Sequence, residues 1–199
     1  MDMPSSDIPQ DDRALIEAFK SGDEFAFVSL YNRYKAAVYA FCVKMLLNRE
    51  QARDAMQETF LRVYENRERL IKTDSFRSWL YTIARNQCLN QLRRNNWQVA
   101  FEPQHEESPS LRPDRETPIQ ELEKSEQIEL VNRYLATLKP DYREVIVLRE
   151  YQNLTYEEIA AITRSSLSAV KSRLFKARRT LAKYLEDALG SEAPKIGVE

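Results

Sequence analysis

Apolar residues recur every three or four positions along most of the chain, which is the spacing that places them on one face of an α-helix. The predicted helices cover residues 11–21, 23–47, 51–69, 76–94, 125–138 and 142–151, with two more between 155 and 185. The scarcity of glycine (3 residues) and the high share of charged residues (31%) also favour helices over an all-β fold. The sequence therefore predicts an all-α protein.

One long interruption of this pattern divides the chain. Residues 96–124 lose the helical period and contain four prolines and many acids, which is typical of an extended linker. We therefore expect a four-helix domain over 11–95 and a second helical domain over 125–189. Residues 1–10 and 190–199 are expected to be tails.

Residues 155–185 carry the most distinctive local pattern, TYEEIAAITRSSLSAVKSRLFKARR and its continuation. Thr155 and Glu158 form a capping box that starts a short helix. Either Ser165 or Ser166 can cap a second helix after a tight turn. A capped short helix, a tight turn and a second helix are typical of the helix-turn-helix motif, whose second helix enters the major groove of DNA.

The exposed face of this second helix is strongly basic. Seven positive residues and no acid lie between Arg164 and Lys183. A solvated helix in an ordinary bundle is the alternative, but such helices usually mix charges of both signs. The uniform positive face favours DNA binding.

The helix over 76–94 is a second candidate for nucleic-acid binding. It carries four arginines and no acid, and the aromatic residues Phe76, Trp79 and Tyr81 lie near its start. Basic groups interleaved with aromatic rings suit single-stranded nucleic acid, because charges follow the backbone while rings stack on bases. A core position is the favoured interpretation for Trp79, whereas both interpretations stay open for Phe76.

Net charge is only −1, although DNA-binding proteins are usually basic. Acidic segments account for the difference: residues 1–24 and 99–123 each carry seven acids and two bases, whereas residues 139–184 carry ten bases and five acids. Two basic surfaces separated by acidic connectors are therefore expected.

The sequence predicts no catalytic, metal or cofactor site. It contains no phosphate-binding loop, no zinc-ligand cluster and no nucleophile–base set. Cys42 and Cys88 are expected to be buried free thiols, and His105 has no ligand partner near it in the sequence. No apolar run approaches the roughly 20 residues of a membrane span, and the acidic N-terminal residues do not resemble a signal peptide, so a cytoplasmic protein is expected.

Two blocks of this sequence resemble the sigma-70 family of RNA polymerase sigma factors, and the short form is similar to its extracytoplasmic-function (ECF) group. DAMQETFLRVYE (54–65) followed by FRSWLYTIARNQCLNQLRR (76–94) resembles region 2. LATLKPDYREVIVLREYQNLTYEEIAAI followed by SAVKSRLFKARR resembles region 4. Their order and spacing make the resemblance specific.

The resemblance implies roles for individual residues. The helix over 54–67 would dock on the clamp helices of the polymerase largest subunit, region 2 would recognise and melt the −10 element, and region 4 would read the −35 element. The implied polymerase-binding residues are Asp54, Gln57, Glu58, Phe60 and Arg62. The implied −10 residues are Lys72, Ser75, Phe76, Arg77, Trp79, Arg85 and Asn86. The implied −35 residues are Arg164, Ser168, Lys171, Ser172, Arg173 and Lys176.

Three positions depart from the family pattern. Arg164 stands where the turn usually has glycine, Ala169 where the family usually has threonine, and Arg53 where an acid is common. Glycine permits a positive φ without a Cβ penalty, so the turn is expected to be strained or differently shaped.

The function implied is that of a sigma factor, which binds core polymerase and directs it to promoters without being an enzyme itself. Expected partners are the clamp helices, the flap of the second-largest subunit, promoter DNA and an anti-sigma factor, with no membrane insertion. The alternative is a helix-turn-helix regulator that acts without docking on polymerase, which would leave the block over 54–94 without a role.

Overall fold

The computed structural model describes residues 10–70, 76–101 and 130–189, and within these ranges the chain forms only helices and turns. The N-terminal unit consists of α1 (Gln10–Lys20), α2 (Glu24–Leu46), α3 (Arg49–Glu65), the short η1 (Arg67–Arg69) and α4 (Phe76–Phe101). The C-terminal unit consists of a helical segment at 130–137, α6 (Pro140–Ile146), the π-helical turn η3 (Val147–Tyr151), α7 (Tyr156–Thr163) and α8 (Leu167–Leu189). The all-α prediction is confirmed.

Capping residues explain where the helices of the N-terminal unit begin. The Asp23 carboxylate accepts hydrogen bonds from the backbone N–H groups of Phe25 and Ala26, and Asn48 accepts one from Gln51. Gly22 separates α1 from α2 and has a φ of 94°, which glycine adopts at little cost. α4 continues to Phe101, beyond the predicted end at Arg94.

A buried carboxylate connects α1 with α2, and two buried thiols connect α2 with α4. Asp12 is buried and accepts hydrogen bonds from Tyr34, at 2.6 Å, and from Arg33. Cys42 and Cys88 are both buried and free, and a hydrogen bond with Cys42, together with burial, raises the pKa of the Cys88 thiol. The prediction of buried free thiols is therefore confirmed for this pair.

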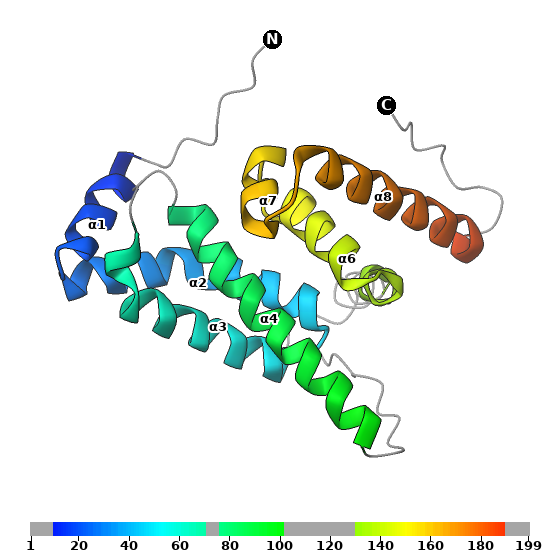
Figure 1. Cartoon of the computed structure of the whole chain (residues 1–199), viewed down its shortest axis with the longest axis horizontal. Coiled ribbons are helices and arrows are strands. Elements are labelled where there is room, and N and C mark those ends of the chain that lie inside the picture. The colour runs from blue at the N-terminus through cyan, green and yellow to red at the C-terminus, as the bar shows by residue number, and fades with distance from the viewer. Residues whose placement is uncertain (1–9, 71–75, 102–129, 190–199) are drawn as a thin grey trace, which may run out of the picture.

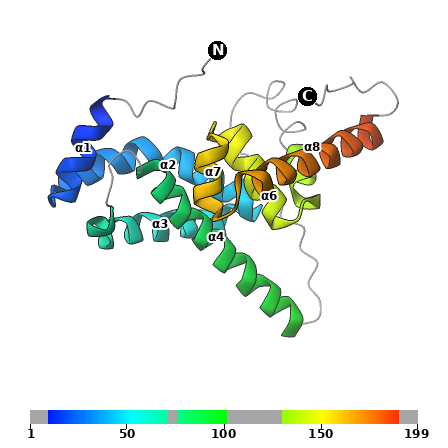
Figure 2. The same ribbon diagram turned by 45° about the horizontal axis from the view of Figure 1, so that its top comes forward.

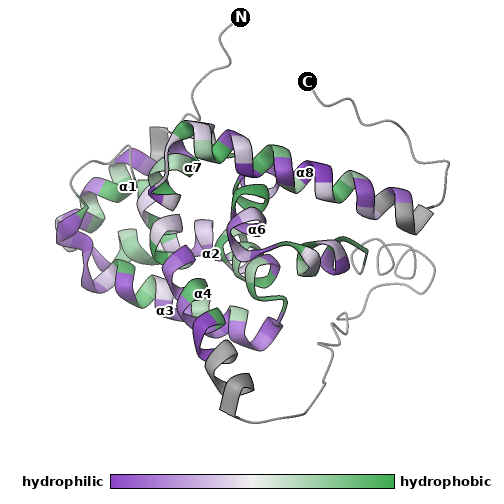
Figure 3. Cartoon of the chain, turned by 45° about the vertical axis from the view of Figure 1, so that its right-hand side comes forward, coloured by the Kyte–Doolittle hydropathy of each residue, from purple (hydrophilic) through white to green (hydrophobic). Residues whose placement is uncertain are grey.

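The two units pack against each other instead of standing apart. In Figures 1 and 2, α7 lies beside the first half of α4, while the end of α4 projects away from both units. The buried apolar residues of both units belong to one core cluster. Hydrophilic residues along α8 are interrupted by hydrophobic ones at regular intervals (Figure 3), as expected of a helix with one buried face.

Candidate nucleic-acid interface

The helix-turn-helix forms as the sequence predicts. The Thr155 backbone N–H donates to Glu158 at 2.7 Å, and the Glu158 N–H donates to the Thr155 hydroxyl at 3.2 Å, which completes the capping box. Ser166 accepts a hydrogen bond from the Ala169 N–H at 3.2 Å, so of the two candidate caps Ser166 starts α8. Arg164 ends α7 in the left-handed region, with φ 51° and ψ 45°. The turn therefore has the positive φ that glycine favours, and arginine bears the strain.

α8 presents opposite faces to the core and to solvent. Val170, Leu174 and Ala177 are buried. Five of the six predicted −35 residues are exposed: Arg164, Ser168, Lys171, Ser172 and Lys176. This face therefore offers cations and hydroxyls to a partner, as a recognition helix requires.

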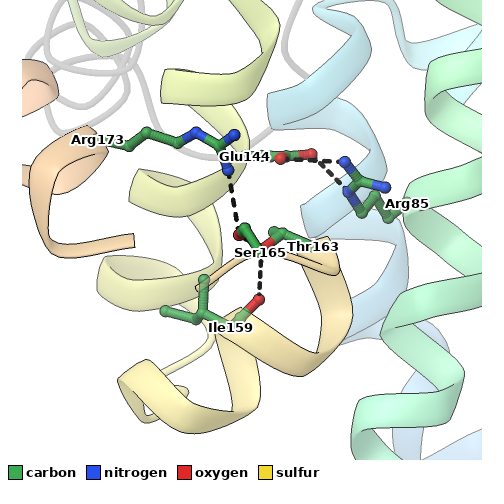
Figure 4. Close-up of polar contacts among 6 residues, drawn as sticks. All are labelled: Arg85, Glu144, Ile159, Thr163, Ser165 and Arg173. Atoms are coloured by element: carbon green, nitrogen blue, oxygen red, sulfur yellow. Dashed lines mark hydrogen bonds and ion pairs between the residues drawn. The ribbon is translucent and has the colours of Figure 1, made fainter. Parts of the chain in front are cut away.

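Arg173 is the exception among the predicted −35 residues. It is only half exposed, and its Nη1 donates to the Ser165 hydroxyl at 3.2 Å. The Thr163 and Ser165 hydroxyls lie 2.5 Å apart, and Thr163 donates to the Ile159 carbonyl at 2.7 Å (Figure 4). Arg173 is therefore held by the turn itself, which fixes its position at the start of the basic face.

One exposed residue on α8 was missing from the predicted site. Phe175 is 50% exposed and follows Lys171 by four residues, so it lies on the same side of the helix. An exposed phenylalanine on a recognition helix can contact the methyl group of thymine. The signal in the sequence was an aromatic residue between basic ones on the recognition helix, which a search for charged residues alone does not select.

α4 carries two stripes of predicted −10 residues that face different surroundings. Trp79 and Asn86 line an open groove of about 330 Å³ between α3 and α4. The groove's lining residues are Arg62, Asn66, Arg69, Trp79, Ile83, Asn86, Gln87 and Asn90. Cations, amides and one half-exposed indole are the groups that bind single-stranded nucleic acid. Asn66, Arg69 and Asn90 were absent from the predicted site, because only the tertiary packing of α3 on α4 brings them into this groove.

The second stripe consists of the predicted −10 residues Arg77 and Arg85 together with Tyr81, which was not predicted to contact DNA. It faces the C-terminal unit and is called the covered stripe below. Arg77 donates to the backbone carbonyl of Gln152, and the Tyr81 hydroxyl donates to the Gln152 side chain. Arg85 donates to both carboxylate oxygens of Glu144, at 2.6 and 3.2 Å. Burial raises the pKa of the Tyr81 hydroxyl, so Tyr81 is a neutral donor.

The structure corrects the expectation for Phe76, which is 1% exposed. Its ring packs against Tyr34, with centroids 5.5 Å apart, and against Trp79, at 6.2 Å. It is therefore a core residue and cannot stack on a base in this arrangement. Trp79, for which a core position was favoured, packs against the core and is partly buried, with part of its ring lining the groove. Lys72 and Ser75 lie outside the described residues.

The outer face of α3 carries the predicted polymerase contacts. Asp54 and Gln57 are exposed, and Glu58 forms an ion pair with Arg62 at 2.8 Å. A groove of about 400 Å³ joins Asp54, Glu58 and Arg62 to residues of α4, namely Gln87, Asn90, Gln91 and Arg94. Phe60 corrects the prediction: it is 3% exposed and packs edge-on against Tyr31, so it supports this face without being available for contact.

Within the described ranges, no group of three or more His, Cys, Asp or Glu residues is placed to hold a metal ion. A search of the same ranges finds no helix with the length and apolar character needed to cross a membrane.

Two family models match the chain. The model for sigma-70 region 2 matches residues 30–98, and that for sigma-70 region 4 matches residues 128–181. The chain belongs to the sigma-70 family. The open groove and the α3 face lie within its region 2, and the helix-turn-helix lies within its region 4.

Curated relatives place this sigma factor in the ECF group. It is 32% identical to the ECF RNA polymerase sigma-E factor of Haemophilus influenzae over 88% of this chain and 95% of that protein. It is 29% identical to the RNA polymerase sigma-H factor of Pseudomonas aeruginosa over 90% of this chain and 96% of that protein.

Solved structures share the fold of this sigma factor. CnrH in complex with the cytosolic domain of CnrY is 24% identical, with a TM-score of 0.67 over 88% of this chain and 97% of that one. The sigma factor RpoE of Bartonella quintana, in complex with the anti-sigma factor NepR, is 24% identical, with a TM-score of 0.66 over 80% of this chain and 96% of that one.

Proposed function

We propose that this sigma factor binds core RNA polymerase through the outer face of α3, reads the −35 element with α8 and engages the −10 element with the groove between α3 and α4. The observation that carries the proposal is the presence of two separate surfaces suited to nucleic acid in one chain of this family. The polymerase performs the catalysis, and the sigma factor contributes recognition and the binding energy for strand opening.

Reading of the −35 element uses two kinds of contact. Lys171 and Lys176 are exposed cations suited to phosphates, which position the helix on the duplex without specifying sequence. Ser168 and Ser172 carry exposed hydroxyls that can donate to or accept from base edges, and Phe175 adds an apolar contact. The Thr163–Ser165–Arg173 network holds the start of α8 in place for this contact.

Engagement of the −10 element requires an opened strand. The groove holds Trp79 beside Arg62, Arg69 and two asparagines, so a base can stack on the indole while cations contact the backbone. Stacking of a base on an aromatic side chain contributes about 1–3 kcal/mol. With Phe76 in the core, Trp79 is the proposed stacking residue.

Docking on polymerase can be tested separately from DNA binding. The triple variant Asp54→Ala, Gln57→Ala, Glu58→Ala should lose capture of core polymerase while its circular dichroism stays unchanged, because exposed substitutions change stability by only about 0.5 kcal/mol each. A matched control alters three exposed positions of α2, Ser29→Ala, Asn32→Ala and Lys35→Ala, and should bind polymerase normally. Polymerase capture by the α3 variant at the wild-type level would contradict this assignment.

We also propose an anti-sigma factor as a regulatory partner and the cytoplasm as the site of action. Two structures similar in fold are complexes, one with the anti-sigma factor NepR and one with the cytosolic domain of CnrY, and both proteins are similar to this chain along most of their length. The helix-turn-helix regulator that never docks on polymerase is disfavoured, because region 2 matches as well as region 4.

A further inference from the structure

Helix α1 precedes the part of the chain that matches sigma-70 region 2, since that match begins at residue 30. α1 lies at the end of the N-terminal unit that also contains η1, and the two elements are in contact (Figure 1). Arg69 of η1 lines the groove between α3 and α4 that is proposed to engage the −10 element. α1 therefore packs beside this groove, although the sequence assigned it no role there.

Apolar packing and one buried carboxylate attach α1 to the rest of the unit. Ile16 and Phe19 are 0% and 1% exposed, and the Phe19 ring stacks on that of Phe27 with centroids 5.4 Å apart. Asp12 is buried just as deeply. Burial of a carboxylate costs free energy that an apolar residue would avoid, and a buried charge can instead specify geometry. The partners of Asp12 therefore indicate what it positions.

The contacts of Asp12 lead through two rings to Trp79. The Tyr34 hydroxyl on α2 donates to Oδ2 of Asp12 at 2.6 Å, and Arg33 pairs with Oδ1. The Tyr34 ring packs in edge-to-face geometry against Phe76, the first residue of α4, with centroids 5.5 Å apart. The Phe76 ring in turn packs against that of Trp79, at 6.2 Å. One hydrogen bond thus restrains the first of three rings in continuous contact.

The nature of each contact explains how this restraint passes along the series. Burial raises the pKa of the Tyr34 hydroxyl, so the hydroxyl stays protonated and donates at neutral pH. A hydrogen bond to a carboxylate is roughly twice as strong as a neutral one, so it fixes the direction of the ring. Phe76 is 1% exposed and has no polar group, so its orientation depends on the rings beside it. Trp79 packs on this ring and lines the groove, so a shift of Phe76 would move the indole.

We propose that Asp12 is a positioning residue for −10 recognition: through two intervening rings it holds the indole of Trp79 in the orientation in which a base can stack on it. This inference rests on the proposed function of the groove and deepens it. A ring that is already ordered binds better, because ordering it during association would use part of the binding energy. Trp79 lies outside the covered stripe, so its position can be measured in the free chain.

Two substitutions break the first contact of the series. Tyr34→Phe removes only the hydroxyl, and Asp12→Leu removes the acceptor while keeping a side chain of similar size. Asp12→Asn is the conservative variant that should restore the position of the indole. Its amide oxygen still accepts from the Tyr34 hydroxyl, and only the ion pair with Arg33 is lost.

Two controls separate this contact from general effects. Tyr64→Phe makes the same chemical change on a ring that packs against Phe27, because the Tyr64 hydroxyl donates to the Glu24 carboxylate at 3.4 Å. Ile16→Val trims the buried apolar packing of α1 and leaves the polar contacts of Asp12 in place. The first control reports the loss of a hydroxyl as such, and the second reports a looser attachment of α1.

The first readout is the fluorescence of Trp79 in the free, full-length chain. The chain has two tryptophans, so a Trp97→Phe background leaves Trp79 as the only one. Tyr34→Phe and Asp12→Leu should raise the acrylamide quenching constant about twofold and lower the anisotropy, because a released indole populates additional rotamers. Asp12→Asn and both controls should match the parent protein, and circular dichroism should show that the helices persist in every variant.

The second readout is binding of the same chain to fluorescent mixed-sequence single-stranded DNA of about 12 nucleotides, within the range of known single-strand sites. Salt of about 50 mM keeps the electrostatic contacts strong enough to measure a weak complex. Tyr34→Phe and Asp12→Leu should weaken binding about threefold, which is less than the loss caused by Trp79→Ala. In a Trp79→Ala background, Tyr34→Phe should have no further effect, because the ring that it positions is absent.

Unchanged quenching in both Tyr34→Phe and Asp12→Leu would overturn the positioning role. An equal change in Ile16→Val would overturn it as well, since any loosening of α1 would then move the ring. A displaced indole with wild-type DNA affinity, while Trp79→Ala binds weakly, would show that orientation is irrelevant to stacking. Wild-type affinity of Trp79→Ala would instead contradict the proposed function of the groove, and the quenching result distinguishes this from failure of the Asp12 contact because it requires no DNA.

Discussion

Arg143 is a buried cation on which the ends of two helices depend. Its guanidinium donates to the carbonyls of Leu135 and Met45, both at 2.8 Å, and more weakly to those of Ala136 and Leu138, at 3.4 and 3.3 Å. The last carbonyls of a helix have no partner within the helix. Arg143 supplies one at the end of the 130–137 helix and, across the contact between units, another near the end of α2.

The cost of removing this guanidinium can be estimated from these bonds. A hydrogen bond to a charged group contributes about 1.5–3 kcal/mol, and the two 2.8 Å bonds carry most of the effect. Burial lowers the pKa of Arg143, which shows that its charge is desolvated, and release from that cost offsets part of the loss. We expect Arg143→Met, which keeps the packing of the aliphatic stem, to lower the free energy of unfolding by about 3 kcal/mol.

The assay is urea unfolding followed by circular dichroism, with Arg149→Met as the matched control. Arg149 donates a single hydrogen bond to the Leu154 carbonyl at 2.8 Å and lies over the Tyr156 ring at 5.0 Å, so its replacement should cost about 1–2 kcal/mol. An Arg143→Met protein no less stable than the Arg149→Met protein would refute the reasoning that multiple helix-end carbonyls depend on one side chain.

Three further results are expected. Arg164→Gly should raise the thermal midpoint, because relief of the positive φ is worth about 1 kcal/mol, and a lowered midpoint would show that the turn is not strained. Phe175→Ala should leave stability almost unchanged but relax the preference for thymine at one position of the −35 element, as measured by binding to a randomised promoter library with polymerase, and an unaltered preference at every position would exclude a base contact. Burial raises the pKa of Glu144 in the folded protein above its ordinary value of 4.5. The contribution of Glu144 to the free energy of unfolding is therefore fully present below pH 4.5 and is lost as the pH rises through the folded-state pKa. The free energy of unfolding of Glu144→Gln relative to wild type should therefore rise between pH 4.5 and 7, and a flat difference would contradict this direction.

Local features of this chain could be predicted from the sequence because they depend on neighbouring residues. The Thr155–Glu158 capping box, the Ser166 cap and the basic face of α8 each lie within a few residues of sequence and appear as expected. Recognition of the family then supplied the assignment to polymerase and promoter binding, which the matches to regions 2 and 4 confirm.

The packing of one unit on the other could not be predicted in this way. Arg85 and Glu144 are separated by 59 positions and by the linker, and neither has a local signal that identifies its partner. The period alone could not place Phe76 in the core, because Phe76 and Trp79 are both aromatic and lie one helical turn apart; in the structure Phe76 is buried and Trp79 is partly buried against the core. The roles of individual residues on these surfaces remain predictions.

The π-helical turn η3 has a consequence for how the helix-turn-helix is aimed. A π-turn places one more residue in a turn than an α-helix does, and each residue of a helix advances the rotation by about 100°. Val147 and Leu148 are buried in the core, and the wider turn ends at Tyr151, before the short connection to α7 at Tyr156. The extra residue in this turn therefore helps to set the orientation of α7 and α8. Deletion of one residue here should reorient the helix-turn-helix relative to the rest of the protein while leaving the motif itself intact.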